Sequence, residues 1–158
     1  MAVDVFLKLG TIKGESKDDK HKDEIEVLSW SWGVHQVGTI GRGTGGGAGK
    51  ADFAPLTILH SVDKASPVLM MACATGEHIK DATLISRKAG KGQQEYLIIK
   101  LNDIIVTSVS PSGSSEHPSE SFTLMPAKVD LEYKPQKMDG SLDAGVSFKY
   151  DIVANKKV

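Results

Sequence analysis

The sequence predicts a mainly β protein, a barrel or a sandwich, that carries a single helix. Several segments alternate apolar and polar residues with a period of two and are separated by turn residues. Only the segment 65–73 repeats its apolar residues at helical spacing. Many strands at nearly regular spacing with one helix are typical of β-barrels and sandwiches.

Composition and charge narrow the classes of function. The 158 residues are 40% hydrophobic and 25% charged, with a formal charge of -1, so we expect one globular domain spanning residues 1–158. Phosphate binding relies on a basic excess, which is lacking, so nucleic acid is not an expected partner. The start of the chain lacks the basic region of a signal peptide, and no apolar run approaches the roughly 20 residues of a membrane span. We therefore expect a soluble protein made in the cytoplasm.

The first elements are a strand and a loop. The apolar residues Val3, Val5, Leu7 and Leu9 alternate with Asp4, Phe6 and Lys8. Because Phe6 adds an apolar residue to the second face, we expect a central strand with both faces partly buried. Residues 10–24 mix glycine with many charged residues and predict a long exposed loop.

Residues 25–34 predict one strand that holds both tryptophans. Side chains alternate between the two faces of a strand. The bulky face then consists of Leu28, Trp30, Trp32 and Val34, and the small polar face of Val27, Ser29, Ser31, Gly33 and His35. A small polar face suits a surface against which other molecules slide or pack, which favours assembly and binding over catalysis.

A glycine-rich stretch, residues 38–50, precedes the next strand. It resembles a phosphate-binding loop, but Thr44 stands where the first motif glycine should be and Ala51 where the Mg²⁺-binding Ser or Thr should be. We interpret it as a loop that orders on assembly. Residues 51–60 predict a strand that Pro55 places at an edge or a bulge.

The helix is expected to begin near Asp63 or Ser66 as a cap, with Pro67 in its first turn, and to end at Gly76. Its predicted apolar face consists of Ala65, Val68, Leu69, Ala72 and Cys73. Met70 and Met71 flank this face and either extend the core or contact a neighbouring chain. Cys73, the single cysteine, is interpreted as a buried thiol rather than a catalytic one.

The rest of the chain predicts strands, with a break in one and a turn between two others. The apolar face of the second strand changes at Asn102-Asp103, which predicts a bulge or a sharp bend. Asp139-Gly140 lies between the last two strands, so these are expected to pair as a hairpin. The predicted strands are residues 83–88, 96–110, 121–133 and 146–153.

Residue patterns typical of catalysis are missing from the sequence. The five histidines are scattered without a metal-ligand spacing, and no G-x-S-x-G nucleophile motif occurs. We therefore expect no cofactor, no metal and no enzymatic activity.

The order of several segments resembles the haemolysin-coregulated proteins (Hcp) of bacterial type VI secretion. The segments are residues 25–33, the glycine-rich stretch, and residues 63–73, 87–90, 95–99 and 133–137. The resemblance implies a β-barrel of two sheets with one flanking helix. It also implies six copies in a ring with a wide channel, and rings stacked into the inner tube that a sheath expels. Such a protein leaves the cytoplasm through the secretion apparatus itself, without a signal peptide.

The same resemblance implies the partners and the site. The partners are other copies of the chain, small effector proteins carried in the lumen, and the sheath and spike components. We place Ser31 in the lumen as an effector contact, with Ser29 and His35 beside it because they share its face. The competing interpretation is that these small residues let a neighbouring element pack closely.

Subunit and ring contacts are expected at two loops, residues 10–24 and 38–50. Ring closure needs two different complementary patches on each subunit. Two other functions stay open from the residues alone. One is a monomeric β-barrel that binds a small ligand, and the other is a small hydrolase.

Overall fold

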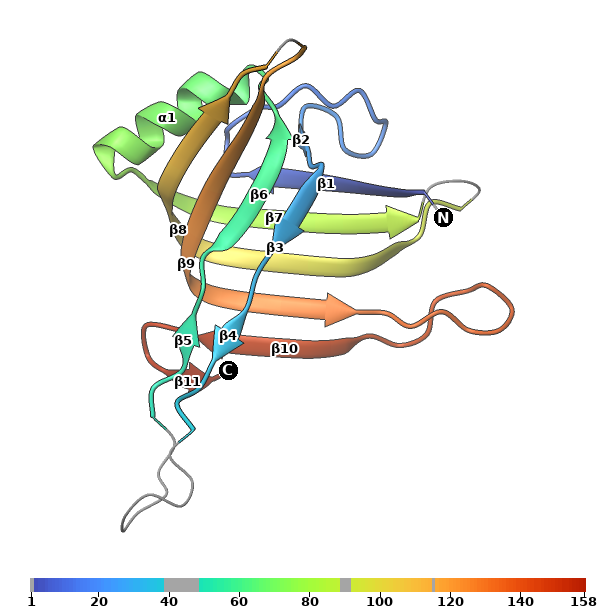
Figure 1. The fold of residues 1–158 in the computed structure, drawn as a ribbon. Helices are drawn as coiled ribbons and strands as arrows, with labels where there is room; N and C mark the ends of the chain where they lie inside the picture. The colour runs from blue at the N-terminus through green and yellow to red at the C-terminus, as the bar shows by residue number, and fades with distance from the viewer. Residues whose placement is uncertain (1, 39–48, 89–91, 115) are drawn as a thin grey trace.

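The computed structural model describes residues 2–38, 49–88, 92–114 and 116–158. These residues are mainly strand, with one helix in the described ranges, as predicted (Figure 1). The elements in order are β1 (Val3–Leu9), β2 (Ile25–Glu26), β3 (Ser29–Ser31), β4 (Val34–His35), β5 (Asp52–Phe53), β6 (Leu56–Ser61), α1 (Ala65–Thr75), β7 (His78–Lys88), β8 (Glu95–Ser112), β9 (Ser119–Tyr133), β10 (Val146–Asp151) and β11 (Lys156–Lys157).

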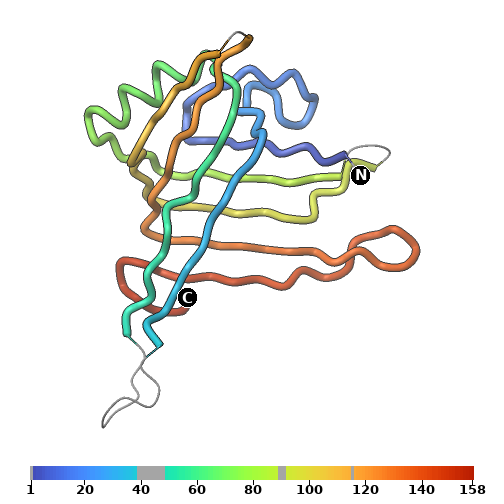
Figure 2. The backbone as a smooth tube through the Cα atoms, in the orientation of Figure 1, coloured from blue at the N-terminus to red at the C-terminus, as the bar shows by residue number. Residues whose placement is uncertain are grey.

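A single bent sheet makes both layers of the fold. Its strand order is β11-β10-β9-β8-β7-β1-β2, with β6 paired to β9 and β3 paired to β6. β8 and β9 are long enough to take part in both layers, and Figure 2 shows both of them bending where the layers meet. β3 and β6 therefore cross the direction of β1, β7 and β10 (Figure 1). The ladder does not close into a full barrel, because β3 pairs with β6 and not with β1.

The bend in β8 lies at Asp103, whose φ of 52° is in the left-handed region. Leu101 before it and Ile104 and Val106 after it are all buried. Odd-numbered residues therefore face the core before the bend, and Ile104 and Val106 face it directly after the bend. A register shift between Val106 and Ser108 then returns odd-numbered residues to the core side, beginning with Val109. The change of face predicted at Asn102-Asp103 is confirmed.

Helix α1 covers one side of the core and packs against β8. Asp63 Oδ1 accepts a hydrogen bond from the backbone N–H of Ala65 at 2.9 Å, and Gly76 ends the helix with a φ of 68°. The C-terminal end agrees with the prediction. At the start, the cap position is held by Lys64, whose side chain makes no capping hydrogen bond, and Asp63 lies one residue before it. The apolar face is narrower than predicted, because Ser66 is buried while Val68, Met70 and Met71 are exposed and Cys73 is only partly buried.

The segment 10–24 forms no helix or long strand, and most of its charged side chains are exposed, as predicted, but part of it is buried against the rest of the fold. A Cβ on Gly14 would lie 2.5 Å from the carbonyl oxygen of Glu24, so only glycine fits this close backbone approach. His21 is 4% exposed and contacts Glu24 and Glu95. The segment thus packs on the outer side of β1 and β7 as an ordered part of the fold.

An ion pair between Arg87 and Asp18 also holds residues 10–24 against β7. The Arg87 side chain from β7, 2% exposed, donates to both Asp18 carboxylate oxygens, at 2.9 and 2.5 Å. The hydrogen bond from Arg87 lowers the pKa of Asp18, and Asp18 in turn raises the pKa of Arg87. The guanidinium group lies over the Phe6 ring at 4.8 Å.

The tryptophan segment is three short strands and not one. The Val27 N–H donates to Val5 of β1, whereas the Leu28 N–H donates to Leu59 of β6. The chain therefore crosses from one layer to the other between these two residues. As a result Val27 is buried and Leu28 is 64% exposed, the reverse of the predicted faces.

The remaining predictions concern the connections between strands. Pro55 separates β5 from β6, and β9 pairs with β10 in the predicted antiparallel hairpin. The glycine-rich stretch, with its likeness to a phosphate-binding loop, falls mostly outside the described residues. Among the described residues, no helix has the length and apolar character needed to cross a bilayer.

Candidate functional site

Small hydroxyl side chains cover the exposed side of the layer formed by β3, β6, β9 and the C-terminal part of β8. The strand register aligns them in rows across the four strands. One row joins Ser31, Thr57, Thr123 and Ser108, a second joins Ser29, Leu59, Ser121 and Ser110, and a third joins Ser61, Ser119 and Ser112. We call the hydroxyl-bearing members of these rows the hydroxyl face.

The core lies directly behind this face. Trp30, Ile58, Phe122 and Val109 form the row between the first two hydroxyl rows and point to the other side. Ile58 and Phe122 are fully buried, and Trp30 and Val109 pack against the core. The alternation of strand side chains therefore makes one side of the layer apolar and the other polar.

The hydroxyl face offers hydrogen bonds without charge. Thr123 Oγ1 lies 2.6 Å from Thr107 Oγ1 and 2.7 Å from Ser108 Oγ. Each hydroxyl can donate and accept. A second molecule on this face would meet small groups that match many polar surfaces, with no fixed charge to select one sign.

The structure brings two of the three predicted site residues together. Ser29 and Ser31 lie two residues apart on β3, exposed and on the hydroxyl face. His35 lies instead on the separate β4–β5 ladder, where its Nε2 is 3.2 Å from Asp52 Oδ2. His35 is 72% exposed and is therefore accessible, but it belongs to a different two-stranded sheet.

Sequence reasoning found only the β3 part of the hydroxyl face. It missed the residues on β6, β8 and β9, which supply most of the face. The signal was available, because serine or threonine occupies every second position of residues 108–112 and 119–123. What the sequence could not show is the register that places these two segments beside β6.

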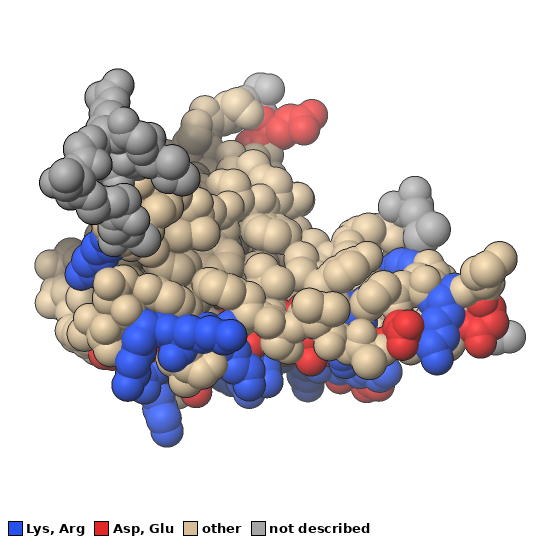
Figure 3. Space-filling model, turned by 90° about the horizontal axis from the view of Figure 1, so that it is seen from below, with Lys and Arg blue, Asp and Glu red and all other residues tan. Residues whose placement is uncertain are grey.

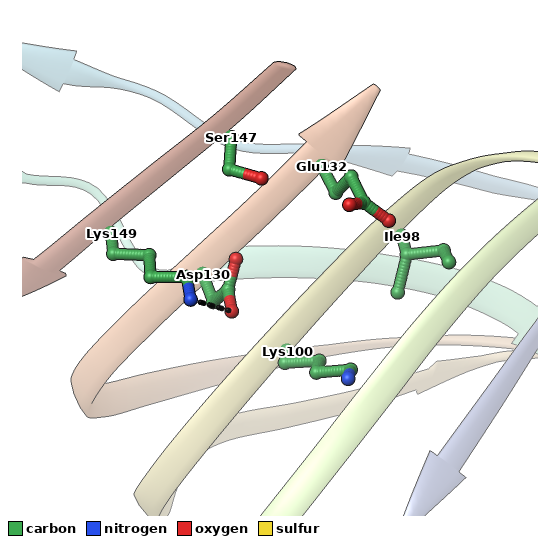
Figure 4. A pocket seen from close by; sticks show the side chains of 6 residues that line it. All are labelled: Ile98, Lys100, Asp130, Glu132, Ser147 and Lys149. Carbon is green, nitrogen blue, oxygen red and sulfur yellow. Dashed lines mark ion pairs between the residues drawn. The ribbon is translucent and has the colours of Figure 1, made fainter. Parts of the chain in front are cut away.

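The other halves of β8 and β9, with β10, expose a charged surface, which we call the charged face. Lys100, Asp130 and Lys149 form a cross-strand row of alternating sign, and Lys149 Nζ is 3.9 Å from Asp130 Oδ2 (Figure 4). Ile98, Glu132 and Ser147 complete a shallow hollow there. In the space-filling view, most charged side chains gather along one margin and the hollowed surface beside them is largely uncharged (Figure 3).

Neither face carries an arrangement of groups for catalysis within the described ranges. Each of the five histidines contacts a carboxylate or a backbone carbonyl, and none of these contacts is to a serine. The same ranges hold no cluster of three or more histidine, cysteine or acidic residues placed to bind a metal ion.

Comparison with known proteins gives a consistent result. The family model described as "Type VI secretion system effector, Hcp" matches residues 6–133. The chain is 48% identical to the protein Hcp1 of Pseudomonas aeruginosa over 98% of each chain. Its fold is similar to the crystal structure of Hcp1 from Salmonella typhimurium, with a TM-score of 0.83, 43% identity and full coverage of both chains.

A second solved structure, described as a type six secretion system protein, matches with a TM-score of 0.91 and 31% identity, covering 99% of this chain and 100% of the other. The match spans both layers of the sheet and helix α1, so it includes the hydroxyl face. The resemblance noted in the sequence is thereby confirmed, and with it a secreted structural role in place of an enzymatic one. The chain belongs to the Hcp family of type VI secretion proteins.

Proposed function

We propose that six copies of this chain form a ring whose channel is lined by the hydroxyl face, and that the rings stack into the inner tube of the type VI apparatus. Family membership supports the tube role. The hydroxyl face is the observation that carries the channel assignment. It is exposed in the single chain, and its small side chains leave room for a guest to pass.

The channel would carry small effector proteins, with Ser31 as a contact and Ser29 beside it. Hydroxyl groups hydrogen-bond to many polar surfaces, and a charged wall would select effectors of one sign. The cost of ordering short side chains is small. Such a wall holds a guest weakly at many points and releases it at the end of the tube. His35 would contribute from the rim formed by β4 and β5.

The test is Ser31→Gln, which fills part of the channel at the centre of the hydroxyl face. We expect co-purified effector to fall at least several-fold while the rings persist. Ser147→Gln is the matched control, because Ser147 is also an exposed strand serine but lies on the charged face. Unchanged effector in Ser31→Gln rings would overturn the channel assignment.

Ring closure would use an apolar opening between the two layers. Val3, Leu28, Tyr133 and Val146 are each between 46% and 69% exposed, although they are large apolar side chains. Two hollows that share Val3 and Tyr96 connect Leu28 with Tyr133. Helix α1 exposes Val68, Met70 and Met71 and lies across the view in Figure 1 from the start of β1, so it would supply the second, different patch that a ring requires.

Leu28→Glu tests this contact by placing a charge in the apolar opening. Leu28 is already exposed in the single chain, so we expect the fold to persist and the ring to dissociate. Light scattering after size exclusion measures the mass. Met138→Glu is the control, since Met138 is fully exposed outside the opening. If Leu28→Glu still forms a full-size ring, the apolar opening is not part of the contact between subunits.

The same proposal includes the path of the protein. It is made in the cytoplasm and leaves through the apparatus without a signal peptide. The charged face of β8, β9 and β10 would then be turned outwards, towards the sheath. The spike would lie at the end of the tube.

A further inference from the structure

A histidine and a glutamate are buried together in the core behind the hydroxyl face. His60 of β6 is fully buried and Glu120 of β9 is 1% exposed, and they are cross-strand partners. His60 Nε2 lies 2.8 Å from Glu120 Oε1. The imidazole ring also meets the edge of Phe122 at 5.2 Å between centroids. Buried charges are rare unless they are paired, so this pair needs an explanation.

A second carboxylate approaches the other side of the same ring. Asp63 Oδ2 lies 3.8 Å from His60 Nδ1. Asp63 also begins helix α1, because its Oδ1 accepts from the Ala65 N–H and its own N–H donates to Ser66 Oγ at 3.1 Å. His60 therefore stands between the β6–β9 ladder and the first turn of the helix.

The protonation state of His60 decides how many of these contacts can be made. Neutral imidazole has one N–H and can donate to only one carboxylate, whereas the protonated ring donates from both nitrogens. His60 Nδ1 and Glu120 Oε2 are buried without a hydrogen-bond partner in the structure. A buried carboxylate that faces a neutral ring is costly, and a protonated ring compensates its charge.

We infer that His60 is a proton-controlled latch that fastens the start of helix α1 to the β6–β9 ladder. With the ring protonated, Glu120 and Asp63 are both held and the helix start is tied to the strands. With the ring neutral, the contact to Asp63 weakens and the first turn of α1 loosens. The latch acts within one subunit, so it goes beyond the proposed function and holds whether or not the hydroxyl face lines a channel.

The surroundings of the His60 ring favour its protonated form. Burial by itself lowers the pKa of His60, but the two nearby carboxylates of Asp63 and Glu120 outweigh it and raise that pKa above 6.5. Asp63, which is 12% exposed, borders a surface hollow that Glu15, Glu26 and His117 also line, so one of the two carboxylates beside the ring reaches the surface. Because the folded pKa is raised, the stabilisation is complete below about pH 6.5 and is lost as the pH rises through the folded pKa.

The experiment compares the full-length protein with His60→Gln, which keeps a donor but does not titrate. Melting temperatures are measured by calorimetry between about pH 5 and pH 9. We expect the advantage of the wild type over His60→Gln to be largest at the acidic end and to shrink as the pH rises. The unfolding equilibrium constant should change by about tenfold for each pH unit between the unfolded and folded pKa values. His78→Gln, at an exposed histidine whose side-chain partner is Asp103 and not Asp63 or Glu120, should leave the wild-type profile unchanged.

A local measurement shows whether the helix start responds. Hydrogen exchange at the amides of Ala65 and Ser66, corrected for the intrinsic effect of pH, should lose protection as the pH rises in the wild type and not in His60→Gln. Parallel melting profiles of the two proteins would overturn the latch. If His60→Gln does not fold, the imidazole of His60 is titrated by NMR in the wild type. A pKa at or below 6.5 in that titration would overturn the latch equally.

Discussion

The two halves of β8 and β9 expose surfaces of opposite chemistry. In the half that pairs with β10, the exposed side carries Lys100 of β8 and Asp130 of β9, and β10 adds Lys149. In the half on the other side of the bend at Asp103, where β9 pairs with β6, the exposed side carries Ser108 of β8 and Thr123 of β9 with the rest of the hydroxyl face. One pair of strands therefore builds a charged face in one layer and an uncharged hydrogen-bonding face in the other.

The two faces suit different surroundings in the proposed ring. Alternating charges remain solvated and neutralise one another on a surface open to water, where exposed ion pairs stabilise little. Short hydroxyl side chains need less space and less water, which suits a surface confined inside a channel. The bend gives a single sheet a charged face in one layer and an uncharged face in the other, so changes on either side of Asp103 should have unlike consequences.

The largest effect is expected behind the hydroxyl face. Phe122→Ala removes a fully buried ring between Ser121 and Thr123, which should lower the free energy of unfolding by about 3 to 5 kcal/mol. Ser121→Ala, one residue away on the other side of the strand, should change it by less than about 0.5 kcal/mol. Urea denaturation measures both. Equal losses would mean that the two sides of β9 are not divided as described.

A smaller loss is expected from the buried ion pair behind β1 and β7. Arg87→Met leaves Asp18 without its partner and removes a guanidinium group that is almost fully buried over the Phe6 ring. It should therefore lower the free energy of unfolding more than any single substitution on the charged face. The pKa of Asp18 is lowered by Arg87, so this stabilisation is present above about pH 4 and is lost on further acidification. A difference from the wild type that persists unchanged at acidic pH would contradict the role of the pair.

We expect the stability of the bend to depend on the residue at position 103. Asp103→Val places a β-branched side chain at a φ of 52°, which should cost about 1 to 2 kcal/mol. Asn102→Val is the matched control, since Asn102 precedes the bend and is exposed on the same strand. Thermal unfolding separates the two variants. A cost shared equally by both would show that the left-handed backbone is not the reason for the bend.

The smallest effect is expected on the charged face. Lys149→Met removes the exposed contact to Asp130 at 3.9 Å and should change the free energy of unfolding by less than about 0.5 kcal/mol. Raising the salt concentration should reduce even that difference, because exposed charges are screened. A loss as large as that of Arg87→Met would show that this surface is buried in the assembled protein.

Local patterns predicted the parts of the fold that depend on near neighbours. The ends of α1 follow from Asp63 and Gly76, and the bend follows from the change of apolar face around Asp103. The packing of residues 10–24 was not predictable, because Asp18 meets Arg87 69 residues later in the chain. The crossing between Val27 and Leu28 likewise depends on distant partners, Val5 and Leu59.

The candidate site shows the same limit. Ser29 and Ser31 stood out beside the tryptophans, whereas the hydroxyls of β6, β8 and β9 gain their meaning only from the register of four strands. His35 was grouped with Ser31 by counting along one strand. The interruption at Trp32 and Gly33 puts it on a separate ladder instead.

A cryo-electron microscopy reconstruction of the assembled protein tests the proposed ring most directly. We expect a six-membered ring in which Ser31, Thr57 and Thr123 line the channel, while Lys100, Asp130 and Lys149 face outwards. A ring with the hydroxyl face packed against a neighbouring subunit or turned to the outside would contradict it.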